Sequence, residues 1–235
     1  MVAGFVSLLL LRHGQSEWNA LRRWQGLADS PLNDLGRQQA ANAATALDSV
    51  APHHGPFGSV WSSPLQRAAE TGEIIARRLG LDEVRVDERL READAGEWQG
   101  LTPQEIDVAY PGFLDGHLRP PTFEPGDVVI DRSLEALGEI VDVTGPGAAT
   151  VIVTTHSGVI RSLARHLGAD DERVPNLGGV WLSVRHDRSA TGVSVRFDLR
   201  GRFDPHGVVR TGVDAPGEDP GEQPDEAQAH RRTQR

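Results

Sequence analysis

The chain has 235 residues, a formal net charge of −10 and no cysteine. Its length fits one α/β domain with a large core, and its acidity excludes non-specific binding to nucleic acid, which needs a basic surface. Disulfides, thiolate metal sites and cysteine nucleophiles are excluded, as is lysine-dependent chemistry, because arginine supplies all the cations other than histidine.

The first predicted element is a strand over residues 5–11, which contains four consecutive leucines. A short, unbroken apolar run that ends near glycine is typical of a strand buried on both faces of a parallel sheet. Ligands bind just beyond the carboxyl ends of such strands, so we expect Arg12 and His13 to lie in an active site. This apolar start lacks the charged region and cleavage site of a signal peptide, and no stretch is as long as a membrane span. We therefore expect a cytoplasmic protein.

Helices and strands alternate in the next part of the chain. Asn33 is a typical helix cap, and a serine followed by Pro64 predicts a second helix start. The predicted elements, in order, are a polar loop over 15–31, a helix from 33–34 through 47, a turn over 52–58, a strand over 59–61, a helix from 64 that ends at Gly80 and a strand over 84–86.

The second half continues the alternation. Residues 102–105 predict a helix with a capping box, whereas the many prolines and glycines of 110–126 predict an irregular lid. The remaining elements are an amphipathic helix over 127–143, a buried strand over 149–154, a helix from 157 to 167 and two closing strands over 179–184 and 193–199, joined by a turn over 187–192. This order predicts a three-layer α/β/α domain with a mainly parallel sheet over residues 1–203, followed by a disordered acidic tail over 204–235.

Four motifs in series carry a resemblance to a known family. They are LRHGQSEWN at 11–19, SSPLQRAAET at 62–71, LRE with GEWQG at 90–100 and THSGVIR at 155–161. Together they resemble the histidine phosphatase superfamily, which also contains the cofactor-dependent phosphoglycerate mutases. The resemblance covers residues 5–199 and implies a phosphoglycerate mutase-like fold.

The resemblance implies a role for each matching residue. His13 is expected to attack phosphorus and form a phosphohistidine, while Glu92 protonates the leaving group and then activates water. Arg12 and Arg67 would hold the phosphoryl oxygens, since guanidinium offers a planar fork of donors, and His156 would add a further donor. The residues expected to line the pocket or its mouth are Asn19, Gln25, Gly26 and Ser157.

Each of these residues also has a simpler interpretation. Arg67 could pair with Glu70 or Glu73 on a helix surface, and Glu92 could pair with Arg89 or Arg91 in a solvated loop. His156 could only cap the helix that follows its strand. The motif series favours the catalytic interpretation of all three.

The predicted function is a metal-independent phosphomonoesterase that acts on small phosphorylated metabolites and needs no cofactor. Two alternatives remain open: a 2,3-bisphosphoglycerate-dependent phosphoglycerate mutase, and a catalytically silent protein that binds phosphorylated ligands. The short stretch between Glu92 and His156 favours the phosphatase, since the mutases have a longer insertion with more basic residues. Residues 126–128 depart from the Gly-Glu-Ser that often opens the long helix in the phosphatase branch. Nucleic acid and membranes are not expected partners, and a homodimer that pairs through an edge strand is considered.

Overall fold

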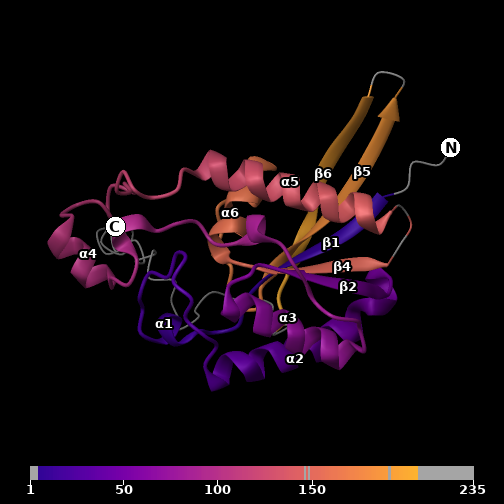
Figure 1. Ribbon diagram of the computed structural model, residues 1–235, viewed down its shortest axis with the longest axis horizontal. Helices are drawn as coiled ribbons and strands as arrows, with labels where there is room; N and C mark the ends of the chain where they lie inside the picture. Colours follow the sequence, from indigo (N-terminus) through magenta and orange to yellow (C-terminus); the bar gives the residue numbers. More distant parts are fainter. Residues whose placement is uncertain (1–4, 146, 148, 190–191, 206–235) are drawn as a thin grey trace, which may run out of the picture.

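A computed structural model of the chain describes residues 5–145, 147, 149–189 and 192–205. Its strands form one six-stranded sheet in the order β3-β2-β4-β1-β5-β6 (Figure 1). The pairings β3·β2, β2·β4 and β4·β1 are parallel, whereas β5 is antiparallel to both β1 and β6. The strands are β1 (Phe5–Arg12), β2 (Phe57–Ser62), β3 (Arg85–Val86), β4 (Thr150–Thr155), β5 (Gly179–Ser189) and β6 (Gly192–Phe203).

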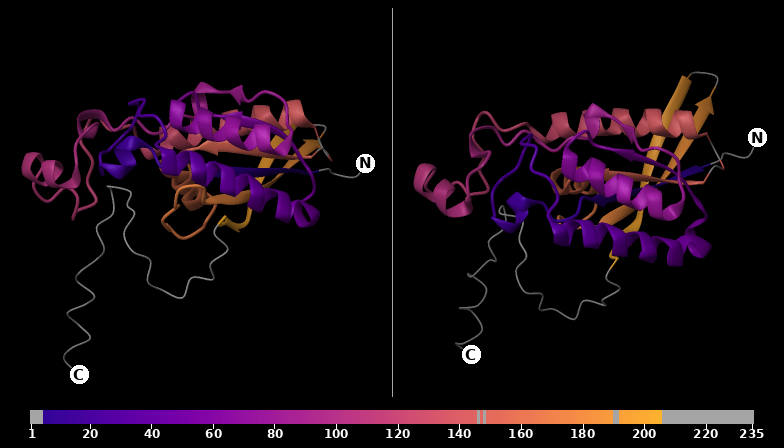
Figure 2. Two further views of the ribbon diagram at one scale, coloured as in Figure 1. Left: turned by 90° about the horizontal axis from the view of Figure 1, so that it is seen from below. Right: turned by 60° about the horizontal axis from the view of Figure 1, so that its bottom comes forward.

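The helices cover both faces of this sheet, which confirms the expected α/β/α fold class (Figures 1 and 2). Helices α5 and α6 pack on one face, and α2 and α3 pack on the other. The helices are α1 (Glu17–Ala20), α2 (Asp34–His54), α3 (Gln66–Leu79), α4 (Pro103–Ala109), α5 (Gly126–Thr144) and α6 (Ser157–His166), with short 3-10 helices η1 (Glu88–Leu90) and η2 (Gly96–Trp98).

Strand β1 lies at the centre of the molecule. Leu8 and Leu10 belong to the core cluster under α5 and α6, and Leu9 and Leu11 belong to the cluster under α2 and α3. All four leucines have 0% exposed surface, because successive side chains of a strand point to opposite faces of the sheet. The leucine run therefore anchors both layers at once, as its unbroken apolar character predicted.

A smaller apolar cluster lies outside the two main cores. Trp98 and Ile106 are fully buried there, and Trp24 and Phe123 pack against them. Helices α1 and α4 lie at the end of the sheet opposite the N-terminus, which is the end toward which β1 runs (Figures 1 and 2). Residues 110–125 of the predicted lid lie between α4 and α5 and contain no helix or strand, whereas residue 126 begins α5.

Some boundaries differ from the sequence-based expectation for local physical reasons. The loop over 15–31 contains α1, because Ser16 and Asn19 form a reciprocal capping box. Helix α2 continues to His54, through part of the expected turn, and ends at Gly55, which has φ 82°. Helix α3 begins at Gln66 and not at Pro64.

Two further expectations concern the C-terminal part. The closing hairpin is confirmed, but its strands extend to Ser189 and from Gly192, so they include most of the expected turn. The expected tail over 204–235 lies outside the described residues, apart from residues 204 and 205. Among the described helices, none combines the length and apolar character needed to cross a membrane.

Candidate active site

Two neighbouring parallel strands bring the two motif histidines together. Arg12 at the end of β1 is in register with Thr155 at the end of β4. His13 and His156 therefore both follow directly after the carboxyl ends of these two strands. The backbone N–H of His13 donates to the carbonyl of Thr155 over 3.0 Å, which fixes the two chain ends to each other. The imidazole ring centroids are 5.2 Å apart in an edge-on arrangement. The site therefore lies where the carboxyl ends of parallel strands predict it.

The hydrogen bonds of His13 fix its tautomer. Its Nδ1 lies 2.6 Å from the carbonyl oxygen of Gly14. Because a carbonyl oxygen only accepts, Nδ1 carries the proton, and in the neutral ring Nε2 keeps its lone pair. Burial, followed by the charges of Arg67 and Arg12, holds the pKa of His13 well below its usual value. The side chain is thus a neutral imidazole with a nucleophilic Nε2.

His156 is held by a different partner and has the same charge state. Its Nε2 lies 2.8 Å from the hydroxyl oxygen of Ser63, and its buried Nδ1 has no hydrogen-bond partner among the described residues. Burial and the charge of Arg67 are the largest of the effects that depress its pKa. His156 occupies the N-cap position of α6 without a side-chain capping bond, so capping does not account for its orientation.

Arg67 is completely buried in the first turn of α3, which rules out the alternative of a surface ion pair. Its Nη1 donates to the carbonyl of Ala28 over 2.7 Å and its Nη2 to that of Gly26 over 2.9 Å. Its buried Nε has no partner among the described residues. Burial lowers the pKa of Arg67 to about 10, so the side chain stays cationic at neutral pH. Glu70, the partner considered in that alternative, pairs with Arg37 at 2.7 Å.

Arg12 is the second buried cation of the site, with 3% of its surface exposed. Its Nη1 donates to the carbonyl of Val174 over 2.8 Å, and the side-chain amide of Asn176 donates to the carbonyl of His13 over 2.9 Å. The loop before β5 therefore fixes both residues of the Arg-His pair. Two buried arginines next to two neutral histidines form a pocket suited to an anion.

The residues expected at the pocket mouth build the loop that holds Arg67. The Asn19 side chain accepts from the backbone N–H of Ser16, and Gln25 accepts from the Ser16 hydroxyl over 2.7 Å. Gly26 offers its carbonyl to Arg67 and has φ 50°. A Cβ at Gly26 would lie 2.6 Å from the backbone nitrogen of Ala95, so only glycine fits there.

Glu92 comes from the segment after η1, and its carboxylate lies against the start of α6. Its Oε1 accepts from the N–H of Ala93 over 2.9 Å and its Oε2 from the N–H of Gly158 over 3.2 Å. Ser157, which precedes Gly158, is buried, and its hydroxyl has no partner among the described residues. Arg89, considered as a partner of Glu92, pairs with Asp87 and Glu139. The structure therefore brings all nine sequence-predicted residues to one end of the sheet or to the loops beside it.

Several supporting residues were not singled out from the sequence. Thr71 accepts from the N–H of Gly14 over 3.1 Å and donates to the carbonyl of Arg67 over 2.6 Å. Ser63 and Thr71 lie inside a recognised motif, which was the available signal for them. Asn176 and Arg132 carry no local signal, because their contacts cross 163 and about 40 positions of sequence.

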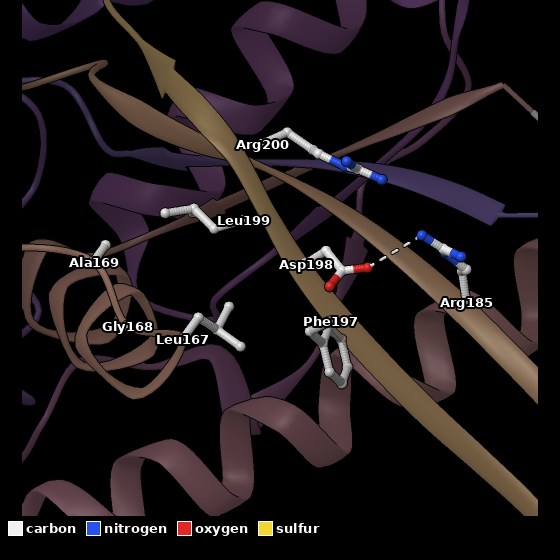
Figure 3. A pocket seen from close by; sticks show the side chains of 8 residues that line it. All are labelled: Leu167, Gly168, Ala169, Arg185, Phe197, Asp198, Leu199 and Arg200. Carbon is white, nitrogen blue, oxygen red and sulfur yellow. Dashed lines mark ion pairs between the residues drawn. The ribbon is translucent and has the colours of Figure 1, made fainter.

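A separate hollow of about 470 Å³ lies on β5, β6 and the end of α6, and none of the predicted site residues lines it (Figure 3). Asp198 and Arg185 pair there at 3.7 Å. Within the described part of the chain, no group of three or more histidine, aspartate or glutamate side chains could hold a metal ion. The two buried arginines make the arrangement at the end of β1 and β4 suited to an anion.

The chain is similar in sequence and in structure to phosphatases of one superfamily. The family described as the histidine phosphatase superfamily (branch 1) matches residues 8–186. A glucosyl-3-phosphoglycerate phosphatase of Mycolicibacterium vanbaalenii is 38% identical over 213 residues, which cover 84% of this chain and 92% of that protein. A metal-independent phosphoserine phosphatase of Arabidopsis thaliana is 35% identical over 163 residues, 66% of each chain. The solved mycobacterial glucosyl-3-phosphoglycerate phosphatase with VO3 is 31% identical, with a TM-score of 0.66 over 83% of this chain and 98% of that one.

Proposed function

This chain belongs to branch 1 of the histidine phosphatase superfamily, and we propose that it hydrolyses small phosphorylated metabolites through a phosphohistidine on His13. Its relatives support a phosphatase of this superfamily that acts on such metabolites. The observation that carries the mechanism is the tautomer of His13. With the proton on Nδ1, the Nε2 lone pair is free to attack phosphorus beside the two arginines.

In the first step, a bond forms between Nε2 of His13 and phosphorus, and the bond from phosphorus to the leaving oxygen breaks. Arg12 and Arg67 bind the phosphoryl oxygens, and His156 offers its buried Nδ1 to the same group. For that donation the Nδ1 must carry the proton, so the Ser63 hydroxyl donates to Nε2 of His156. Glu92 gives its proton to the leaving alkoxide.

In the second step, Glu92 accepts a proton from water while the water oxygen bonds to phosphorus. The bond between phosphorus and Nε2 of His13 breaks, which releases inorganic phosphate and restores the neutral imidazole. Arginine, histidine and glutamate side chains supply every role in these two steps, so the proposed reaction is written without a metal or a cofactor.

The first substrate to test is a phosphorylated glyceric acid that carries a sugar. Two of the compared proteins are named glucosyl-3-phosphoglycerate phosphatase. Substrate selectivity would be determined by residues 110–126 together with the loop over 15–31. These two segments contact each other, because Arg119 of the lid lies 5.3 Å from the ring centre of Trp24 in that loop.

Compartment and assembly belong to the same proposal. The sequence lacks cysteine, which suits the reducing cytoplasm. Strand β6 is an edge of the sheet and offers a second copy a place to pair, which supports a homodimer. A net charge of −10 argues against a nucleic-acid partner. Sedimentation of the purified chain would test the homodimer directly.

The decisive experiment measures hydrolysis of p-nitrophenyl phosphate by the wild type and by His13→Ala, each with and without a chelator. We expect chelator-resistant turnover that is lost in the variant, and a labelled phosphohistidine after an acid-free quench. Absence of turnover by folded wild-type protein over a broad pH range and a metabolite panel would contradict the phosphatase. Phosphate binding without turnover would then indicate the silent binder, and turnover only with a bisphosphorylated primer would indicate a mutase.

A further inference from the structure

Arg132 of α5 binds the backbone of the segment that carries Glu92. Its Nη1 donates to the carbonyls of Arg89 and Arg91 over 2.6 and 2.7 Å. Its Nη2 donates to the carbonyl of Glu92 itself over 3.1 Å. One guanidinium therefore holds two backbone carbonyls that precede the proposed acid and the backbone carbonyl of the acid itself.

Glu124 completes the arrangement from the other side of Glu92. It accepts from Nε and Nη2 of Arg132 over 2.8 and 3.0 Å, which is a bidentate pair. The same carboxylate accepts from the N–H of Asp94 over 3.0 Å, and the Glu124 N–H donates to the Asp94 carbonyl over 2.9 Å. Glu92 thus stands between two backbone points that a single ion pair joins.

The Arg132–Glu124 ion pair is largely shielded from solvent. The Arg132 and Glu124 side chains are each 10% exposed, so neither solvent nor salt screens them strongly. Burial alone would raise the pKa of Glu124, but the hydrogen bonds from Arg132 and Asp94 and the charges of Arg132 and Arg91 together outweigh it and leave the pKa below its usual value. Removal of one partner would leave the other as a buried charge without its counterion.

We propose that the Arg132–Glu124 pair is the positioning device for Glu92, and this inference rests on the acid–base role proposed above. Both residues act through the backbone, so they are positioning residues and not catalytic ones. A general acid must lie within hydrogen-bond reach of the leaving oxygen, and small misplacements carry large rate penalties. The pair sets where the Glu92 carboxylate lies, whereas the residues of the phosphate pocket stand at the ends of β1 and β4 and in the first turn of α3.

The test compares benzyl phosphate, whose alkoxide needs protonation, with p-nitrophenyl phosphate, whose leaving group does not. The ratio kcat/KM reports the steps up to phosphoryl transfer. In Glu124→Gln and Arg132→Lys we expect kcat/KM for benzyl phosphate to fall about tenfold or more beyond any loss for p-nitrophenyl phosphate. The inhibition constant of inorganic phosphate should change less than about twofold, because its four ligands keep their own supports.

A purely structural role predicts a different result, namely equal losses on both substrates or a loss in phosphate affinity, and either outcome would overturn the inference. Unchanged kinetics would overturn it too. Glu139→Gln is the matched control, because Glu139 also joins α5 to the same segment through Arg89, at the exposed side. Its kinetics should equal those of the wild type.

Two reference measurements keep the outcomes distinct. Glu92→Gln should show the same dependence on the leaving group in a stronger form. If Glu92→Gln lacks that dependence, the proposed acid role fails. If only the pair variants lack it, the positioning role fails alone. Thermal unfolding of each variant identifies any that does not fold, and Glu124→Gln, which preserves the shape of the side chain, then decides the question.

Discussion

The Glu92 carboxylate lies directly against the backbone of Gly158, whose N–H donates to Oε2 over 3.2 Å. A Cβ at position 158 would collide with Oε1 of the same carboxylate. The first turn of α6 therefore donates a hydrogen bond to Glu92 and limits where its carboxylate can lie, and an added side chain at position 158 would displace that carboxylate.

Gly158→Ala should reduce kcat/KM for an alkyl phosphate by about 100-fold, because the added methyl group displaces the Glu92 carboxylate from the leaving oxygen. Gly138→Ala is the matched control. It lies within α5 with nothing within 4 Å of the added Cβ, so activity should stay unchanged while stability rises by about 0.5–1 kcal/mol. Wild-type kinetics in Gly158→Ala would contradict the assigned place of Glu92.

Arg67→Lys should weaken phosphate binding by about 10- to 150-fold, which corresponds to the loss of roughly 1.5–3 kcal/mol for a hydrogen bond to a charged group. Lysine cannot reproduce the fork that binds the Gly26 and Ala28 carbonyls while a further N–H remains for the ligand. Isothermal titration with phosphate measures the effect. Arg37→Lys, at an exposed ion pair, should bind phosphate as the wild type does.

The free energy of unfolding should decrease as the pH falls below about 6.5, the ordinary pKa of histidine. Burial and the neighbouring arginines depress the pKa values of His13 and His156. Over this pH range the unfolded chain therefore binds protons that the folded chain does not bind. The stabilisation is complete above pH 6.5 and is lost as the pH falls toward the folded-state values. Each histidine contributes a slope of up to about 1.4 kcal/mol per pH unit. Urea unfolding measured from about pH 5 to about pH 8 should show a weaker dependence of the free energy of unfolding on pH in His156→Gln.

Arg119→Ala should raise KM for a sugar-bearing substrate more than for p-nitrophenyl phosphate. The guanidinium lies 5.1–5.5 Å from the ring centres of Trp24, Trp98 and Phe123, so its removal loosens the lid from the 15–31 loop. Cation–π contacts at exposed sites contribute about 0.5–1 kcal/mol, which predicts a change of a few fold. Tryptophan fluorescence should report the altered cluster. An equal relative change in KM for both substrates would argue against a selective lid.

The parts of the fold that could be predicted are those with local causes. The leucine run indicated β1 because a strand buried on both faces has no polar alternation to interrupt it. Thr102 and Glu105 indicated the start of α4, where both bonds of the capping box are present. The Arg12–His13 pair was placed correctly at the sheet end, since a strand's carboxyl end is set by topology.

The parts that could not be predicted depend on contacts between distant segments. The start of α3 at Gln66 depends on tertiary packing, because Leu65 at the N-cap makes no side-chain capping bond. The clamp on the Glu92 segment joins residues about 40 positions apart, so no local pattern indicates Arg132. Burial of Arg67 was equally hidden, since a charged residue on an amphipathic helix is ordinarily exposed.

Because Leu8–Leu11 lie between both cores, we expect β1 and the loop over 110–126 to exchange their amide hydrogens in different ways. Amide protons of β1 will exchange with solvent deuterium only when the whole domain unfolds, whereas those of residues 110–126 will exchange through local opening. The proposed nucleophile is thus attached to the part of the chain expected to exchange slowest, and the residues proposed to select the substrate are attached to a part expected to exchange fast. Insertions and replacements in 110–126 can therefore accumulate during divergence, and change substrate preference, at little cost to the sheet that carries the nucleophile.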